Sequence, residues 1–466
     1  MSTLWTSREL EAATLGRARH AFEASGISID TRTLKSGDLF VALRGDARDG
    51  HEFVAAALAR GAAAAMVSHV PGDTSDDVPL LCVAHTLRGL EDLGRAARER
   101  ALGRIVAVTG SAGKTTTKEM LRLALGAFGT THASLASYNN HWGVPFSLAL
   151  LPRKSDFGVF EIGMNHFGEI RTLVDFTRPD IAVVTTIAPA HLEYFGSTEA
   201  IADAKSEIFE GLKQGGAAIV PADNSCTARL IARARQARVE HILTFGEAPG
   251  SDARLLSSSE DSWGIQLEAD ILGHRYRLRV GAAGTHMAQN ALATLLTVAT
   301  FGGDIERAAT ALETFSALKG RGARLAISLG EGAVEVIDES YNANPASMRA
   351  ALSLLGSARP DADGRRIAVL GDMLELGAES SALHVALASP VEEARADLVF
   401  ACGRDMRAMF DALPVSRRGM WGATSSDIAP EVVRTSRPGD VILVKGSLGS
   451  RMAVVLDALK SAGRPV

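Results

Sequence analysis

The sequence predicts an α/β protein of three domains: a central P-loop domain with a parallel sheet, a small N-terminal α/β domain and a Rossmann-like C-terminal domain. Short apolar runs alternate with helical segments over most of the chain, a pattern typical of parallel sheets covered on both faces. The 466 residues suffice for about three domains of roughly 150 residues each. A glycine-rich turn at 110–114 joins an apolar run to an amphipathic helical segment, as phosphate-binding loops do.

The first domain is expected to span residues 1–102. It combines strands in DLFVAL (38–43) and AAAMVSH (63–69) with a helix in FVAAALARGA (53–62). A long polar helix, LRGLEDLGRAARERALG (87–103), is closed by Gly103 and sets the first boundary.

The second domain is expected to span residues 103–315. Its strands and its last helix are predicted in RIVAVTG (104–110), FGVFEIGM (157–164), IAVVTTI (181–187), GAAIVPAD (216–223) and THMAQNALATLLTVATF (285–301). Within the segment 254–280, SWGIQLEADI and HRYRLRV alternate polar and apolar residues around Gly273. This alternation predicts an antiparallel hairpin at the margin of the sheet.

The third domain is expected to span residues 316–466 and to repeat the α/β rhythm. Its strands are predicted in VEVIDES (334–340), RIAVLGD (366–372), DLVFACG (397–403) and DVILVKGS (440–447). Because open α/β sheets bind ligands beyond the carboxyl ends of their strands, we expect these strand ends to aim a second set of loops at a ligand.

Composition narrows the functional class. The net charge is −5, whereas a protein that coats nucleic acid normally has a basic net charge or a basic patch. The charge therefore argues against a nucleic-acid-coating protein. Three scattered cysteines, none in a C-x-x-C pair, fit a reducing compartment and offer no thiolate metal site. The first residues lack the pattern of a signal peptide, and no apolar run approaches 18 residues. We therefore expect a cytoplasmic protein without membrane insertion. An anionic substrate is still possible, because local clusters of charge rather than the net charge would bind it.

The turn at 110–114 is expected to hold nucleotide phosphates. Its glycines let successive N–H groups face one point at the start of a helix. Lys114 can reach the β- and γ-phosphates, and the hydroxyl of Thr115 is placed to bind Mg²⁺. The strict Walker pattern is not met, because Val108 stands where its first glycine should be. The predicted phosphate-binding residues are Gly110, Ser111, Ala112, Gly113, Lys114, Thr115 and Thr116.

Two further residues follow predicted strands at the same sheet edge. Glu161 ends one strand and His191 comes just after the next, so they could meet near the phosphates. A carboxylate suits Mg²⁺, whereas a histidine is a less usual ligand that suggests Mg²⁺ or Mn²⁺ with retained waters. His191 could equally be a structural loop residue, and His166 is expected to be structural or to lie on the substrate side.

Lys205 lies in the middle of a predicted helix, AIADAKSEIFEGL (200–212). A lysine is most often solvated. Its position four residues after Ile201 turns it toward the apolar side of the helix, where it needs a partner or a chemical change.

These motifs together resemble the Mur ligases, the ATP-dependent amide-forming enzymes of bacterial cell-wall assembly. TGSAGKTTTKEM, EIGMNHFGEI, HLEYFGS and AKSEIF are similar to the central domain of that family. SIDTRTLKSGDLFVALRGDARDGHEFV (28–54) resembles its uridine-nucleotide-binding segment. GRGARL, DESYNANPASM, LGDMLELG and VKGSLGSRM resemble its C-terminal domain.

Within the family, SYNANPASM (340–348), NNHWGVPFSLA (139–149) and GDMLELG (371–377) favour the activity that adds D-alanyl-D-alanine to UDP-N-acetylmuramoyl-tripeptide in peptidoglycan precursor synthesis. VKGSLGSRM departs from the family pattern at Leu448, where a basic or polar residue is expected. The resemblance implies ATP and one or two Mg²⁺ as cofactors, an acyl-phosphate intermediate and a monomer. The third residue of the tripeptide, meso-diaminopimelate or lysine, stays open.

The resemblance also implies roles for single residues. Thr115, Glu161 and His191 correspond to Mg²⁺ ligands, and Lys205 to a lysine that is carbamylated in the family. The other implied ATP contacts are Asn290, Arg321, Asp338, Tyr341 and Asn342. The implied contacts with the UDP-linked substrate are Ser28, Asp30, Thr31, Arg32, Ser137, Asn139 and Asn140. The loop at 28–32 would also suit a plain capping turn before DLFVAL.

Other functions stay open at this stage. Another Mur-type ligase could add a different amino acid, or glutamate to folate, although the long N-terminal domain argues against folate. A P-loop kinase or GTPase would not need Lys205, and no N-K-x-D base-reading motif is present. A non-enzymatic nucleotide-gated protein would have no need to keep Lys114, Glu161 and His191.

Overall fold

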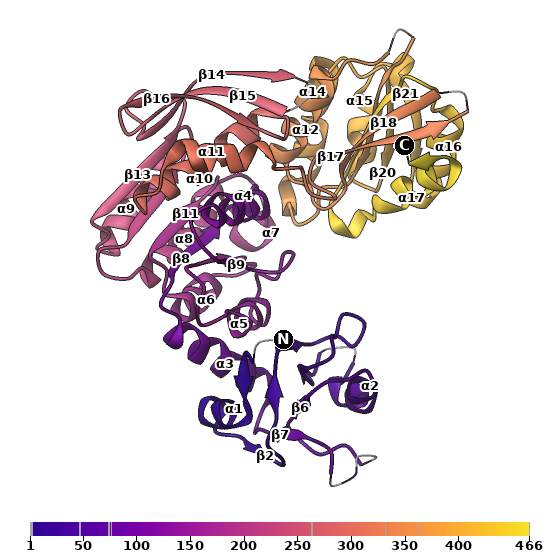
Figure 1. Ribbon diagram of the computed structural model, residues 1–466. Helices are drawn as coiled ribbons and strands as arrows, with labels where there is room; N and C mark the ends of the chain where they lie inside the picture. The colour runs from indigo at the N-terminus through magenta and orange to yellow at the C-terminus, as the bar shows by residue number, and fades with distance from the viewer. Residues whose placement is uncertain are drawn as a thin grey trace.

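The computed structural model describes residues 3–45, 48–72, 75, 77–261, 264–330, 332–361 and 363–465. It contains three separate larger sheets, each with its own helices. In Figure 1 the N-terminal unit lies at the bottom, the central unit above it, and the C-terminal unit at the upper right. The α/β fold class expected from the sequence is confirmed, with structural relatives described below.

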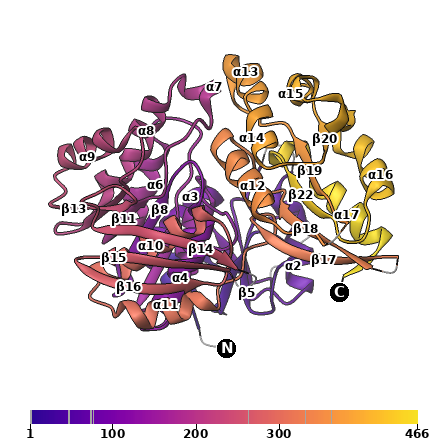
Figure 2. The same cartoon turned by 90° about the horizontal axis from the view of Figure 1, so that it is seen from above.

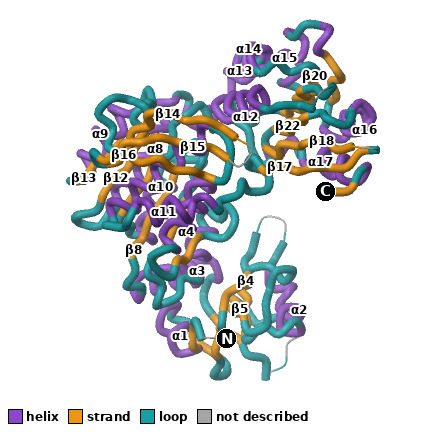
Figure 3. The backbone as a smooth tube through the Cα atoms, turned by 45° about the horizontal axis from the view of Figure 1, so that its top comes forward, coloured by secondary structure: helices purple, strands orange, loops and turns teal. Residues whose placement is uncertain are grey.

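The N-terminal unit is built on a five-stranded sheet of order β2-β7-β6-β5-β4. Its strands are β2 (Arg17–Ala18), β4 (Gly26–Ser28), β5 (Asp38–Val41), β6 (Ala64–Val67) and β7 (Leu80–Cys82). Strands β1 (Trp5–Thr6) and β3 (Glu23–Ala24) pair separately, and the helices are α1 (Ser7–Thr14), α2 (Val54–Ala59) and α3 (Thr86–Arg100). Strands β4 to β7 are parallel. Helix α3 leads up to the central unit (Figure 3).

The central sheet has nine strands in the order β16-β15-β14-β13-β12-β11-β8-β10-β9. Its strands are β8 (Arg104–Thr109), β9 (Thr131–Ala133), β10 (Phe157–Glu161), β11 (Ile181–Val184), β12 (Ala217–Pro221), β13 (His241–Gly246), β14 (Ala253–Asp261), β15 (Gly264–Ile271) and β16 (His274–Val280). The pairs from β9 to β14 are parallel, and β15 pairs antiparallel with β14 and β16. The hairpin around Gly273 at the sheet margin is thereby confirmed, while Ser262 and Trp263 at its start lie outside the described residues.

Helices cover both faces of this sheet, as the apolar runs predicted. They are α4 (Lys114–Gly126), α5 (Gly143–Ala149), α6 (Glu169–Thr177), α7 (Leu192–Phe195), α8 (Thr198–Ser206), α9 (Thr227–Gln236), α10 (Thr285–Thr300) and α11 (Ile305–Glu313). Along β8, Val106 and Val108 pack with α4, α10 and α11, whereas Ala107 packs with α5, α6, α8 and α9. Successive side chains of a strand point to opposite faces, so a doubly covered strand must be apolar throughout.

One predicted helix differs in detail. The segment 200–212 is not a single α-helix with Lys205 in its middle. Helix α8 ends at Ser206 and continues as a 3-10 turn, η2 (Glu207–Gly211), so Lys205 lies in the last turn of α8. The change from α-helix to 3-10 helix occurs at Glu207, whose side chain accepts hydrogen bonds from the backbone N–H groups of Gly168 and Arg171 at the start of α6.

The C-terminal sheet has the order β21-β20-β19-β22-β18-β17-β23. Its strands are β17 (Ala323–Leu329), β18 (Gly332–Glu339), β19 (Arg366–Gly371), β20 (Leu398–Cys402), β21 (Arg418–Gly422), β22 (Val441–Lys445) and β23 (Arg464–Pro465). Its helices are α12 (Pro345–Ser357), α13 (Ser380–Val385), α14 (Ala388–Glu393), α15 (Met406–Ala412), α16 (Ser425–Thr435) and α17 (Ala453–Ala462). Strands β18 to β22 are parallel, with the order reversing between β19 and β22, where such sheets place their ligands.

Candidate active site

A large cavity lies between the central and C-terminal units. Its volume is about 690 Å³. The central unit supplies the loops after β8, β10 and β11 and the start of α10, and the C-terminal unit supplies the loops after β18, β19 and β22. Seen from above in Figure 2, the two sheets stand side by side, with α7 and α13 facing each other. The carboxyl ends of both parallel sheets therefore open into one space.

The phosphate loop forms one wall of this cavity. Lys114 Nζ donates to the carbonyl of Gly110 at 2.8 Å, which folds the lysine back over its own loop. Gly110 has a φ of +149°, and a Cβ there would lie 1.9 Å from Thr185 Oγ1, so no larger residue fits. Burial lowers the pKa of Lys114; the carboxylate of Glu161 opposes this shift and the guanidinium of Arg321 adds to it. The loop thus presents a lysine and the start of α4 to the cavity.

Thr115 and Glu161 meet directly beneath the loop. Thr115 Oγ1 donates to Glu161 Oε2 at 2.7 Å, and Asn139 Nδ2 donates to Glu161 Oε1 at 2.6 Å. Glu161 is almost fully buried, and both of these side-chain donors are neutral. A hydroxyl beside a carboxylate is an oxygen pair that suits a hard cation such as Mg²⁺.

A metal at this place would need further ligands from outside the protein. Within the described part of the chain, no three His, Cys, Asp or Glu side chains gather closely enough to hold a metal ion. Mg²⁺ typically keeps several waters and binds one or two carboxylates together with substrate phosphates. The residues present therefore fit a nucleotide-bound Mg²⁺ rather than a metal caged by protein alone.

His191 lies at the wall of the cavity and faces the C-terminal unit. Its Nδ1 is 2.5 Å from Oε2 of Glu375, in the loop after β19. The ring is not aligned for a linear hydrogen bond, so the contact is a close approach of the two side chains. The neighbouring His191 holds the pKa of Glu375 below its usual value. His166, in contrast, packs its ring against Tyr194, with centroids 4.9 Å apart.

Lys205 is buried, as its helical position predicted. Its side chain is about 1% exposed, and no hydrogen bond or ion pair joins it to another described residue. Burial lowers the pKa of Lys205 well below its usual value, and the positive charge of Lys114 lowers it further. An amine in this setting is neutral far more often than a solvated lysine.

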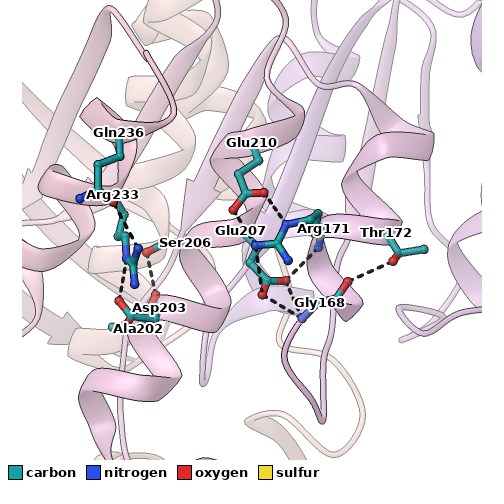
Figure 4. A network of polar contacts seen from close by, with 10 residues as sticks. All are labelled: Gly168, Arg171, Thr172, Ala202, Asp203, Ser206, Glu207, Glu210, Arg233 and Gln236. Carbon is teal, nitrogen blue, oxygen red and sulfur yellow. Dashed lines mark hydrogen bonds and ion pairs between the residues drawn. The ribbon is translucent and has the colours of Figure 1, made fainter.

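Polar contacts hold the helix on either side of Lys205 (Figure 4). Asp203 accepts hydrogen bonds from Arg233 at 2.8 Å and from Arg229 of α9. Glu207 accepts from the backbone N–H of Gly168 at 2.8 Å, at the N-terminus of α6. These contacts tie the residues on either side of Lys205 to α9 and α6.

The C-terminal unit brings Arg321 to the same cavity. Its Nη2 donates to Ser137 Oγ at 3.1 Å, and its guanidinium lies 4.0 Å from the centre of the Tyr341 ring. Other predicted residues that line the cavity are Asn139, Asn140, Asn290 and Asn342. Asp338 is instead fully buried behind it, where its carboxylate accepts from the N–H of Gly320 and from the hydroxyl of Ser340.

The structure does not bring the predicted N-terminal residues to this cavity. Ser28 Oγ donates to the carbonyl of Asp30, and the Asp30 carboxylate pairs with Arg32 at 2.6 Å. The carbonyl of Thr31 accepts from Arg60. These local contacts form a capped turn in the N-terminal unit.

Sequence reasoning missed several cavity residues. Lys445 is about 1% exposed and donates to Glu339 Oε2 at 3.1 Å and to the carbonyl of Asn342 at 2.9 Å. Burial lowers the pKa of His286 at the start of α10. Lys445 follows four apolar residues at the end of a predicted strand, the same signal that singled out Glu161, and could have been found by it.

The fold and the cavity define a three-unit P-loop enzyme of the ATP-dependent ligase class. The chain matches "Mur ligase family, catalytic domain" over 23–97, "Mur ligase middle domain" over 108–298 and "Mur ligase, glutamate ligase domain" over 323–448. The chain belongs to the Mur ligase family, and the resemblance seen in the sequence is confirmed.

Named relatives cover nearly the whole chain. The UDP-N-acetylmuramoyl-tripeptide–D-alanyl-D-alanine ligase of Escherichia coli (strain K12) is 35% identical, over 94% of each chain. The crystal structure of MurF from Acinetobacter baumannii is 32% identical, with a TM-score of 0.84 over 98% of this chain and 99% of that one. The MurF ligase from Thermotoga maritima, solved in complex with ADP, is 25% identical, with a TM-score of 0.77 over 94% and 97% of the two chains.

The helices give no sign of a membrane span. In the described ranges, none combines the length and the apolar character that crossing a bilayer requires.

Proposed function

We propose that this chain is the ATP-dependent ligase that joins D-alanyl-D-alanine to UDP-N-acetylmuramoyl-tripeptide. The observation that carries the proposal is the cavity in which Lys114, the Thr115–Glu161 pair and Arg321 converge from two units. The whole-length similarity to ligases named for this reaction supports the choice of substrates.

The reaction proceeds through an acyl phosphate. A carboxylate oxygen of the tripeptide attacks the γ-phosphorus of ATP, the bond to the β-phosphate oxygen breaks, and ADP leaves. The amine of the dipeptide then attacks the acyl carbon, loses a proton and expels inorganic phosphate. The first step brings two anions together, so cationic groups that screen their repulsion supply much of the catalysis. Lys114 and Arg321 are placed to do this from opposite units.

Mg²⁺, held by Thr115, Glu161 and His191 together with phosphate oxygens, would neutralise charge on the transferred phosphoryl group. Asn139 orients Glu161, and Ser137 links Thr115 to Arg321 through contacts of 3.4 and 3.1 Å. We assign the nucleotide to the wall formed by Asn290, Tyr341 and Asn342. Asp338 lies behind the cavity and fixes the turn that carries Arg321, because its carboxylate accepts a hydrogen bond from the N–H of Gly320.

We assign Lys205 to carbamylation by CO₂. The addition requires a neutral amine, which burial beside Lys114 favours. The product is an anionic carbamate on a long arm. Such an anion would relieve the repulsion between two neighbouring lysines and could support a second metal or its waters.

The three units divide the substrates between them. Residues 1–102 would bind the uridine diphosphate part, with Ser28, Asp30, Thr31 and Arg32 at one turn, and Asn140 of the central unit would contact the muramoyl-peptide at the cavity. Residues 103–315 would bind ATP, and residues 316–466 the dipeptide. Enclosure by the last unit would shut out water that hydrolyses acyl phosphates. We expect the enzyme to act as a cytoplasmic monomer.

A phosphate-release assay tests the proposal. The full chain is supplied with ATP, Mg²⁺ and UDP-N-acetylmuramoyl-tripeptide, carrying either meso-diaminopimelate or lysine, with and without D-alanyl-D-alanine. We expect sustained release only with the dipeptide. Release that ignores the dipeptide, or that responds better to single amino acids or glutamate, would favour another amide ligase.

Replacing Lys205 tests the carbamate separately. Lys205→Ala should lose activity by several orders of magnitude and regain part of it with added acetate or formate, which supply the missing anion. Mass spectrometry of the native enzyme in bicarbonate should show a gain of one CO₂. Full activity of the variant without rescue would remove the carbamate from the mechanism.

A further inference from the structure

A close contact between the central and C-terminal units lies at the wall of the cavity. Besides the His191–Glu375 contact, the backbone N–H of Glu193 donates to the carbonyl of Glu375 at 3.2 Å. Gly377 stands so close that a Cβ there would lie 3.1 Å from Glu193 Cα, and its φ is +60°. The loop after β19 is therefore seated on the start of α7.

The two facing residues both adopt an unusual backbone conformation. His191 has a φ of +59° and Glu375 a φ of +63°, in the left-handed region that non-glycine residues rarely occupy. Such conformations are strained and persist where the surroundings over-determine them, often at functional sites. Both side chains line the cavity. The docked arrangement thus holds two strained residues against each other at the reaction space.

The contact has a chemical meaning for the histidine. An imidazole that binds a metal through one nitrogen commonly has its other N–H held by a carboxylate, which fixes the tautomer and the ring orientation. At His191 the Glu375 carboxylate lies 2.5 Å from Nδ1, out of line for a hydrogen bond in this arrangement, and Nε2 is the ring nitrogen that remains for a ligand. Apart from Glu375, no described group lies within hydrogen-bonding reach of Nδ1.

We propose that Glu375 is a positioning residue that prepares His191 for Mg²⁺, so that docking of the C-terminal unit completes the metal site. The inference rests on the proposed role of His191 as a metal ligand. The central unit alone supplies Thr115, Glu161 and His191, but the carboxylate that orients the histidine arrives from another sheet. Metal affinity and the seating of the C-terminal unit are thereby linked.

Metal binding tests this directly. Mn²⁺ is titrated into the full chain with ADP present, and the bound ion is followed by electron paramagnetic resonance in the wild type, Glu375→Gln and Glu193→Gln. Loss of an outer carboxylate typically costs 10- to 100-fold in metal affinity, and we expect a loss of that size for Glu375→Gln. Glu193→Gln removes an equal charge two residues from His191 and keeps its backbone contact, so it should stay within twofold.

A third variant separates this inference from the proposed function. His191→Ala should weaken Mn²⁺ at least as much as Glu375→Gln. If His191→Ala leaves Mn²⁺ binding unchanged, the proposed metal role of the histidine fails. If His191→Ala weakens binding but Glu375→Gln matches the wild type, only the positioning role of Glu375 is overturned. Gly377→Ala disturbs the seating and leaves both His191 and Glu375 chemically unchanged, so it should weaken Mn²⁺ binding as Glu375→Gln does. An affinity equal to that of the wild type would count against the link to docking.

Discussion

Lys118 is a buried cation that anchors a cavity loop, and its removal gives a sharp test of the structure. It lies one helical turn after Lys114 and is fully buried. Its Nζ donates to the carbonyls of Ser134 and Ala136 at 2.7 and 2.8 Å and lies 2.8 Å from Glu119. The loop that follows carries residues 137–140 to the cavity. Lys118→Met keeps the length and apolar stem of the side chain and removes both hydrogen bonds.

The expected cost follows from these contacts. A hydrogen bond to a charged group contributes about 1.5–3 kcal/mol, so two give about 3–6 kcal/mol if the loop stays in place. Because the loop can turn its carbonyls toward water, we expect the lower end, about 3 kcal/mol. Since about 1.4 kcal/mol is tenfold, local opening should become roughly 100-fold more frequent.

Hydrogen exchange measures this opening without requiring a two-state unfolding transition. The amides of Ser134 and Tyr138, which bond to the carbonyls of Val159 and Leu135, should exchange about 100-fold faster in Lys118→Met. Lys213→Met is the matched control. Lys213 pairs with Asp180 at the surface, with 43% and 27% of the two side chains exposed, and such pairs contribute about 0–1 kcal/mol. Equal exchange of these two amides in both variants would refute the anchoring role of Lys118.

Two further outcomes are expected. Burial raises the pKa of Cys226 and raises that of Cys402 to about 12, whereas Cys82 is partly exposed. A thiol reagent at neutral pH should therefore label one cysteine in the native chain and three after denaturation. Fast labelling of Cys402 in the native chain would contradict its burial. Arg98 is buried and donates at 2.6 and 2.8 Å to two carbonyls at the end of α6. Arg98→Ala should therefore lower the free energy of unfolding of the central unit, measured by urea denaturation, by about 3 kcal/mol. Arg88 is exposed on the same helix, and Arg88→Ala should change this free energy by less than about 0.5 kcal/mol. Equal losses in the two arginine variants would show that charge removal, not the carbonyl contacts, is responsible.

Local sequence patterns predicted much of the fold. The apolar runs of β8, β10, β11 and β12 needed no tertiary information, because a strand buried on both faces must be apolar at every position. The phosphate loop was visible for a similar reason: its glycines and Lys114 are required by the backbone path within five residues. Strands β9 and β17 were not predicted, since the first has only three residues and the second depends on pairing with β18.

The candidate site was predictable only in part. Glu161 could be placed at a sheet edge because it ends an apolar run, and Lys205 could be turned inward because of its spacing from Ile201. The sequence could not show that Asn139 holds Glu161, nor that Asp338 is buried behind the cavity. These facts depend on loops that come together from distant parts of the chain.

The alternation of strands and helices, the phosphate loop and the sheet edges from which side chains reach a ligand could be predicted from the sequence. Each of these features depends on periodicity or backbone geometry over a few residues. Tertiary structure alone decided that Arg321 meets Ser137 and that Glu375 meets His191, across separations of 184 residues in each pair. Such contacts arise from the packing of two independently formed sheets. Their relative position is set by surfaces spread over the whole chain, and no local pattern encodes it.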